Sequence, residues 1–403
     1  MANVSSSNGL EKRPKLRFPG FDEPYKKCRI GDIYAERSQR GAGDMELLSV
    51  TMNDGVMPRS EIEGKDNSSE DKSNYKVVCK GDMVYNSMRM WQGANGISDY
   101  DGIVSPAYTV LMPTEEIDNC YFAALFKTPN LINEFRKNSQ GLTSDTWNLK
   151  YPQISPIRLY IPSLHEQHKI SGFISALESR IRKQCQLVDS LKKYKRGVIQ
   201  HFFRHTDVRT ESQQWQQVFL KDIFKKVSRR NTGALIKNVI TNSAEYGLIP
   251  QRDFFDKDIA VEGNTENYYV IENGDFVYNP RKSNTAPYGP FNRYTLKEQG
   301  IISPLYTCLV LKVDINPSYL AWYFKSDAWH RYIYDNGSQG VRHDRVSMTD
   351  DLLMGIPVIF PERKIQDSIA NTLDLIERKL HLAQSKLEML NKEHKGFMQK
   401  LFI

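Results

Sequence analysis

The chain has 403 residues, which is enough for two or three domains with sizeable cores. Its formal net charge of +7 favours an anionic partner. Its five cysteines show no paired spacing, as is typical of a cytoplasmic protein, and no apolar run approaches the roughly 20 residues that cross a bilayer, so we expect no membrane contact.

The first part of the chain predicts a short leader and a mixed α/β domain. Residues 1–15 are polar and lack the apolar core of a signal peptide, so we expect a disordered leader. A globular domain is predicted over residues 16–162, with a polar loop at 61–74. Its strands are expected at 45–52, 75–86, 104–112 and 154–161, and its helix at 120–138.

A long helix is predicted over residues 163–204, because apolar residues recur there in steps of three and four. So narrow an apolar stripe needs a partner helix. The residues expected to pair are Ile174, Leu177, Ile181, Val188, Leu191 and Val198. Residues 205–214 are polar, lack apolar periodicity and are predicted to be a linker.

The second part of the chain repeats this plan. A second globular domain is predicted over residues 215–361, followed by a helix over 362–403 whose apolar stripe can pair with that of the first long helix. The domain is expected to hold helices at 220–227 and 318–334 and strands at 235–240 and 268–278. The pairing residues of the last helix are expected to be Ile369, Leu373, Ile376, Leu380, Leu387 and Leu390.

Short motifs recur in the same order in both parts. The sequence GDMVYN at residues 81–86 returns as GDFVYN at 274–279, and GIVSPAY at 102–108 returns as GIISPLY at 300–306. The tripeptide Ser-Gln-Gly also occurs once in each part. Each of these motifs is weak alone, but their ordered recurrence predicts a tandem duplication.

These motifs resemble those of the DNA-specificity subunits of type I restriction–modification systems. The likeness rests on G-D-[MF]-V-Y-N, I-[IV]-S-P-x-Y, S-Q-G and the helix end G-x-x-Q-x-[FL]-F, and it covers residues 18–403. The resemblance implies an α+β fold with two target-recognition domains, each followed by a long helix, and the two helices paired as an antiparallel coiled coil. Each domain would read one half of a bipartite target, and the helices would set the spacing.

The same resemblance implies a non-catalytic subunit with several partners: double-stranded DNA, two methyltransferase subunits and, in the full complex, restriction subunits. S-adenosylmethionine and ATP with Mg²⁺ would bind those protein partners, which methylate adenine N6 and cleave unmodified DNA, and this chain would hold no cofactor and no metal. The residue patterns agree, because the chain has no G-x-x-x-x-G-K-[ST] motif and no amino-methyltransferase motif.

DNA readout needs forked donors for guanine, side-chain amides for adenine and cations for phosphate. The loops after both G-D-x-V-Y-N strands carry this mixture, and the Ser-Gln-Gly loops add to it. The candidate DNA-binding residues are Arg89, Gln92, Asn95, Gln140, Thr143, Arg281, Lys282, Asn284, Gln339, Arg342, His343 and Arg345. Polar glycine-rich loops are also common as plain turns whose arginines are merely solvated.

Two other classes of protein stay open as alternatives. One is a stand-alone sequence-specific endonuclease or methyltransferase, and the other is a coiled-coil scaffold whose globular parts bind protein. The missing catalytic motifs count against the enzyme. A scaffold would not need two loops rich in Arg, Gln and Asn at equivalent positions.

Overall fold

A computed structural model describes residues 2–3, 13–41, 44–52, 54–66, 68–143, 146–204, 215–253, 265–337, 344–346 and 348–403. The predicted linker 205–214 and most of the predicted leader lie outside the described residues. The chain forms two compact units: unit 1 comprises residues 1–185 and 385–403, and unit 2 comprises residues 186–384.

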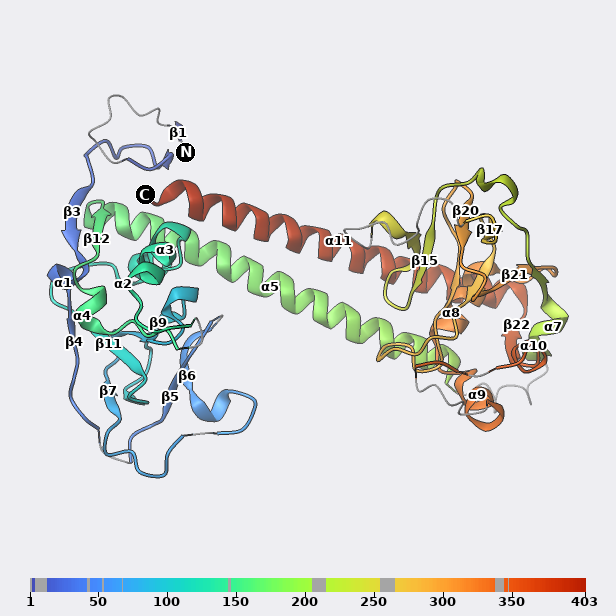
Figure 1. The fold of residues 1–403 in the computed structure, drawn as a ribbon, viewed down its shortest axis with the longest axis horizontal. Helices are drawn as coiled ribbons and strands as arrows, with labels where there is room; N and C mark the ends of the chain where they lie inside the picture. Colours follow the sequence, from blue (N-terminus) through green and yellow to red (C-terminus); the bar gives the residue numbers. More distant parts are fainter. Residues whose placement is uncertain are drawn as a thin grey trace. The chain divides into compact units, whose positions relative to one another are not determined.

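Unit 1 combines short strands with four short helices (Figure 1). The strands are β1 Ala2–Asn3, β2 Leu16–Arg17, β3 Lys26–Arg29, β4 Tyr34–Glu36, β5 Leu48–Thr51, β6 Gly55–Pro58, β7 Lys76–Val78, β8 Met83–Asn86, β9 Asn95–Ile97, β10 Gly102–Val104, β11 Tyr108–Pro113 and β12 Arg158–Ile161. The helices are α1 Ile30–Ile33, α2 Asn119–Leu125, α3 Pro129–Asn138 and α4 Tyr151–Ile154, with 3₁₀ turns η1 Arg59–Glu61 and η2 Met90–Gln92. An antiparallel sheet has the order β4-β11-β8-β9, and β5-β6, β7-β10, β3-β12 and β1-β2 form separate pairs.

Unit 2 repeats this pairing with its own strands (Figure 1). The strands are β13 Trp215–Phe219, β14 Phe224–Val227, β15 Ile240–Ser243, β16 Gly247–Pro250, β17 Tyr269–Ile271, β18 Phe276–Tyr278, β19 Phe291–Arg293, β20 Gly300–Ile302, β21 Thr307–Leu311 and β22 Pro357–Pro361. The helices are α7 Leu220–Ile223, α8 Pro317–Lys325, α9 His330–Asn336 and α10 Asp350–Met354, with 3₁₀ turns η3 Thr232–Ala234 and η4 Gln251–Asp253. The sheet order β14-β21-β18-β19 matches that of unit 1, and the predicted tandem α+β fold is confirmed.

The repeated V-Y-N strands lie at the centre of each unit because both of their faces are covered. Successive side chains of a strand point to opposite faces. In β8, Met83 and Tyr85 join one hydrophobic cluster, whereas Val84 joins another. In β18, Phe276 and Tyr278 likewise lie in a different cluster from that of the residue between them. A strand buried on both faces explains why residues 83–85 and 276–278 are all apolar or aromatic.

Two predicted strands prove to be pairs of strands. The segments 75–86 and 268–278 both turn at a glycine with positive φ, which is +92° at Gly81 and +100° at Gly274. The next residue, an aspartate, fixes each turn: the Asp82 carboxylate accepts a hydrogen bond from the Cys79 amide at 2.8 Å. The repeated Gly-Asp is therefore turn chemistry rather than the start of one long strand.

Other predicted boundaries were wrong for local reasons. The predicted helix 120–138 is two helices, because Pro129 begins α3 and lacks the amide that would continue α2. The predicted helix 220–227 stops after one turn and continues as β14, and the strand predicted at 235–240 starts at its last residue.

Two long helices follow the globular parts. They are α5 Leu164–Phe203 and α11 Arg363–Leu401, of 40 and 39 residues. In unit 1, the Phe173 and Phe397 rings are 4.9 Å apart and a Glu178 oxygen lies 3.5 Å from His394 Nε2, so numbers rise along α5 as they fall along α11. The helices are thus antiparallel there. The predicted pairing residues are all buried or half-buried.

The last residues of each long helix pack into a globular core. In unit 1, the ring of Phe402 lies 5.3 Å from that of Tyr121. In unit 2, the ring of Phe203 lies 5.6 Å from that of Tyr319. Both phenylalanines are nearly inaccessible to solvent. Each core is therefore completed by a helix end that belongs to the other repeat of the sequence.

The start of α5 carries a buried ion pair. The guanidinium of Arg17 donates two hydrogen bonds to the Glu166 carboxylate, at 2.8 and 2.7 Å, and the two side chains are 4% and 0% exposed. These hydrogen bonds raise the pKa of Arg17 further above its usual value. Strand β2 is thereby tied to the first turn of α5. Among the described residues, no helix has the length and apolarity that crossing a membrane would require.

Candidate nucleic-acid interface

In unit 2, the loop after β18 pairs with a segment that follows α9 in sequence. The backbone amide of Lys282 donates to the carbonyl of Asp344 at 2.9 Å. Arg281 and Arg345 form an antiparallel bridge at this point. The structure thus brings together two arginines that were predicted as DNA-binding residues from separate loops.

A glycine allows this loop to close. Gly289 has a φ of +83°, and a Cβ at this position would lie 2.0 Å from the carbonyl oxygen of Asn279. Any other residue would therefore push the two ends of the loop apart. The hydroxyl of Tyr278 adds a hydrogen bond to the carbonyl of Tyr288 at 2.8 Å. The loop is consequently held by its own strand end.

The two arginines line a hollow of about 260 Å³. Its other lining residues are Thr241, Gln251, Asn279, Pro280, Ser303, Leu305 and Tyr306. No acidic side chain among the described residues lines it. Burial raises the pKa of Tyr306, while the charges of Arg281 and Arg345 act in the opposite direction. Arg345 Nε lies 3.5 Å from an Asp344 oxygen, so its charge is partly balanced. The two guanidinium groups are donors without acceptors, so the hollow suits a ligand rich in hydrogen-bond acceptors.

Two further predicted residues, Lys282 and Asn284, are exposed and border a second hollow of about 480 Å³. Tyr288 lies in its wall, with its ring 4.8 Å from that of His330. Tyr288 therefore packs against His330. Three predicted residues of the same unit, Gln339, Arg342 and His343, lie outside the described residues.

In unit 1, the corresponding loops also meet. The amide of Gln140 donates to the carbonyl of Asn148 at 2.9 Å, which closes the Ser-Gln-Gly loop. This loop reaches the one after β8 through Trp147, whose ring lies 5.3 Å from that of Trp91. The guanidinium of Arg136 stands 5.7 Å above the Trp91 ring. Trp91 is therefore a packing residue.

The predicted DNA-binding residues of unit 1 are mostly accessible. Arg89, Gln140 and Thr143 are exposed, and Gln92 is half-buried. Arg89 and Gln92 are joined by a hydrogen bond of 3.3 Å between their side chains. This weak, exposed hydrogen bond uses one donor of the Arg89 guanidinium, so its other donors can still bind a ligand.

Asn95 does not belong to this surface. It is completely buried, and its amide donates to the carbonyl of Gly93 at 3.1 Å. The reason is that the chain turns back into the sheet, where Asn95 begins β9 and pairs with Tyr85. We therefore remove Asn95 from the candidate residues.

One backbone contact joins the two loops in the same way in both units. In unit 1, the amide of Leu149 donates to the carbonyl of Ser87 at 2.9 Å. In unit 2, the amide of Val346 donates to the carbonyl of Pro280 at 2.9 Å. The duplication thus preserves the joined loops as well as the strands, although the side chains that the loops present differ.

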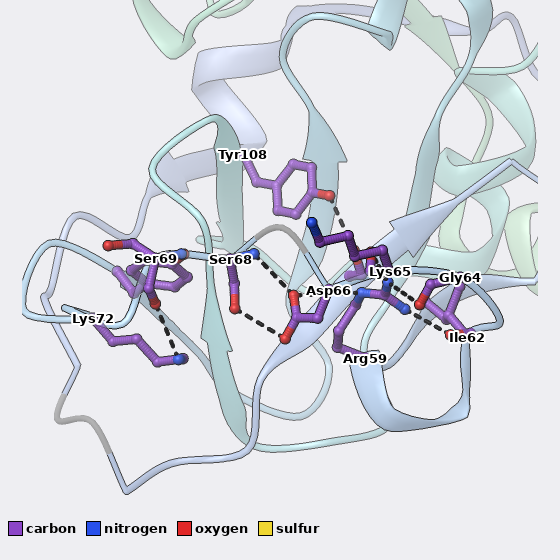
Figure 2. A network of polar contacts seen from close by, with 11 residues as sticks. Arg59, Ile62, Gly64, Lys65, Asp66, Ser68, Ser69, Lys72 and Tyr108 are labelled. Carbon is purple, nitrogen blue, oxygen red and sulfur yellow. Dashed lines mark hydrogen bonds and ion pairs between the residues drawn. The ribbon is translucent and has the colours of Figure 1, made fainter.

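The sequence predicted one strand of the hairpin that borders the hollow of unit 1, at 45–52, but not its second strand, and not the hairpin of unit 2. Unit 1 has a hollow of about 430 Å³ whose lining includes Ser49, Arg59, Ser105 and Tyr108. The equivalent positions in unit 2 are Thr241, Gln251, Ser303 and Tyr306. Figure 2 shows Arg59 and Tyr108 at the unit 1 hollow. The repeated S-P-x-Y motif marked the tyrosine, but no sequence signal marked β6 and β16, the second strands of the hairpins.

Comparison with known proteins shows which proteins this chain resembles. Residues 23–192 match the family model described as the type I restriction modification DNA specificity domain. This part of the chain is therefore similar to the DNA specificity domains of type I systems. The match ends within α5 and does not reach the globular part of unit 2. The likeness of unit 2 to unit 1 rests on their equal strand order.

One curated relative is similar to this chain over part of its length. The chain is 26% identical to the specificity subunit of the type I restriction enzyme HindI of Haemophilus influenzae over 145 residues, which cover 34% of this chain and 31% of that protein. The matched segment is therefore less than a third of that relative's length.

Solved structures are similar to nearly the whole fold of this chain. The S subunit of a type I restriction–modification system from M. genitalium superposes with a TM-score of 0.59 at 14% identity, over 97% of this chain and 99% of that one. A chain from a structural study of complex assembly in the type I system gives a TM-score of 0.54 at 14% identity, over 96% of this chain and 99% of that one. Both likenesses concern the fold.

Proposed function

We propose that this chain is the DNA-specificity subunit of a type I restriction–modification complex, in which each unit reads one half of a bipartite target and the long helices set the spacing of the halves. The chain itself is non-catalytic. Methylation of adenine N6 from S-adenosylmethionine and ATP-dependent cleavage belong to the methyltransferase and restriction subunits.

The joined loops carry this proposal. In both units a post-strand loop and a second loop are held together by an equivalent backbone hydrogen bond. In unit 2 that arrangement sets Arg281 opposite Arg345 in a hollow lined by hydroxyl and amide side chains. Forked donors beside amides and hydroxyls are the groups that read base edges. Two such surfaces in one chain suit a target with two halves.

Arg281→Ala is expected to relax recognition of one half-site and leave the other unchanged. Loss of a bidentate contact with guanine costs about 1–3 kcal/mol of discrimination. The measurement is methylation of a random DNA library by the complex reconstituted with its methyltransferase subunit, followed by sequencing of the modified sites.

The matched control is Arg331→Ala, because Arg331 lies on α9 of the same unit and is 88% exposed. It should leave both half-sites unchanged. Relaxation of both half-sites by Arg281→Ala would contradict the assignment of one unit to each half. A purified chain that bound S-adenosylmethionine and methylated DNA alone would favour the stand-alone enzyme instead.

The helices of unit 2 also carry apolar side chains outside the pairing stripe, which supports docking of the methyltransferase subunits there. On α5, Leu187 and Tyr194 are 47% and 59% exposed. On α11, Leu375 and Leu382 are 47% and 68% exposed. Residues seven apart lie on the same face of a helix. Each helix therefore presents a second apolar stripe that suits contact with further helices.

Leu382→Asp is expected to weaken assembly with the methyltransferase subunit, because a buried carboxylate would replace an apolar contact. Size-exclusion chromatography of the mixed subunits measures this loss. His381→Asp is the control, since the exposed His381 lies on a different face of α11. Equal assembly by the two variants would count against docking on this stripe.

A further inference from the structure

The hairpin at the edge of each hollow ends in the same way in both units. Strands β6 and β16 end at Pro58 and Pro250, and each runs into a 3₁₀ turn. The first residue of that turn is Arg59 in unit 1 and Gln251 in unit 2. Their amides make equivalent hydrogen bonds of 2.8 Å, to the carbonyls of residues 47 and 239. Arg59 and Gln251 therefore occupy equivalent positions of the two units, although their side chains differ.

In unit 1 this side chain is occupied by its own loop. The guanidinium of Arg59 donates to the carbonyl of Ile62 at 2.6 Å, to that of Gly64 at 3.0 Å and to that of Lys65 at 2.7 Å (Figure 2). Its side chain is 17% exposed. Arg59 thus holds the loop that follows it and has few donors left for a ligand.

In unit 2 the same position is occupied by Gln251. Gln251 lines the hollow beside Arg281 and Arg345 and is half-buried. Among the described residues, none forms a hydrogen bond with its side-chain amide. The NH₂ group of a glutamine side chain can donate to N7 of adenine while its oxygen accepts from the N6 amino group, whereas an arginine has no acceptor for that amino group.

Resting on the proposed function, we infer that Gln251 is a specificity-determining residue that reads an adenine in the half-site of unit 2, beside the bases or phosphates contacted by Arg281 and Arg345. The equivalent Arg59 is a positioning residue of unit 1. The repeated position then contributes differently to the two half-sites, because in unit 1 it holds an arginine bonded to its own loop and in unit 2 it holds a glutamine beside two arginines.

Gln251→Ala tests this inference in the complex reconstituted with its methyltransferase subunit, using a random duplex DNA library as the probe. We expect discrimination at one position of one half-site to fall by about 5- to 150-fold, as for loss of a bidentate base contact. Gln251→Glu keeps the shape but loses the donor, so preference at that position should move from adenine towards cytosine. The other half-site should not change.

Gln217→Ala is the matched control, because Gln217 is an exposed glutamine of the same unit on β13. It should leave every base preference intact. Thermal melting of each variant shows whether it is folded, and the nearly isosteric Gln251→Glu keeps the test decisive if the alanine variant is not.

Two failures are distinguishable. If the wild-type complex showed no sequence preference at all, the proposed function would fail. If the wild-type complex read both half-sites and Arg281→Ala relaxed one, while both Gln251 variants kept every preference or weakened all sequences equally, the proposed function would stand and the inference about Gln251 would be overturned.

Discussion

Phe402→Ala is expected to destabilise unit 1, although the substituted residue lies next to the C-terminus of the chain. Phe402 is 4% exposed and packs with Tyr121 in the core of that unit. Truncating a buried phenylalanine costs about 3–5 kcal/mol, because a cavity remains where the ring was. Amide hydrogen exchange should show lost protection in the strands of unit 1 and normal protection in β14, β18 and β21.

The reciprocal variant sharpens this prediction. Phe203→Ala should destabilise unit 2 by a similar amount, since Phe203 is 0% exposed in its core. Leu142→Ala serves as the control, because Leu142 is fully exposed at 101% and a surface change is usually within about 0.5 kcal/mol. If Phe402→Ala reduced hydrogen-exchange protection in unit 2, the end of α11 would not belong to the core of unit 1 alone, and the prediction would be wrong.

Arg17→Met is expected to be the most damaging change at a charged residue of unit 1. It leaves the Glu166 carboxylate buried without its cation, and breaking a buried ion pair from one side costs about 3–5 kcal/mol. The double variant Arg17→Met with Glu166→Gln should recover much of this loss, because no charge then remains buried. Urea denaturation of Arg17→Met, Glu166→Gln, the double variant and the wild type measures the coupling.

An exposed pair at the start of the other long helix gives the comparison. Arg363 lies 2.9 Å from Asp367, and the two side chains are 47% and 45% exposed. Arg363→Met should therefore have little measurable effect, because solvent screens the pair. A double Arg17 and Glu166 variant that was no more stable than the single Arg17→Met variant would show that lost packing, rather than an unpaired charge, causes the damage.

Much of the fold follows from patterns that are local in the sequence. The steps of three and four that predict the long helices and the ordered repeats that predict the duplication both survive in the structure. The predicted boundaries were wrong where a single turn or cap residue interrupts an apolar pattern. Gly81 and Asp82 end one strand and start another, and Pro129 starts a new helix. Turn and cap residues thus override the apolar pattern around them.

The candidate site was only partly predictable, because its geometry depends on contacts between distant segments. Arg281 and Arg345 were found from composition, but their bridge is a tertiary contact. Composition also suggested Asn95, since amides are common in binding loops, whereas its pairing with Tyr85 buries it. Gln251 went unnoticed because one glutamine in a short hairpin carries no pattern, and the hollow beside it forms only in the folded unit.

The helix ends have a consequence for how new specificities can arise. Phe402 packs on Tyr121, and Phe203 packs on Tyr319, which occupies the same place in the other repeat. The two globular domains therefore offer the same receiving surface to the same kind of helix end. Under the proposed function, we expect that a gene segment encoding a domain with this surface could replace either domain without redesign of the helices. Recombination with crossovers near the helix starts would then recombine half-sites, so a small set of domains could supply many bipartite targets.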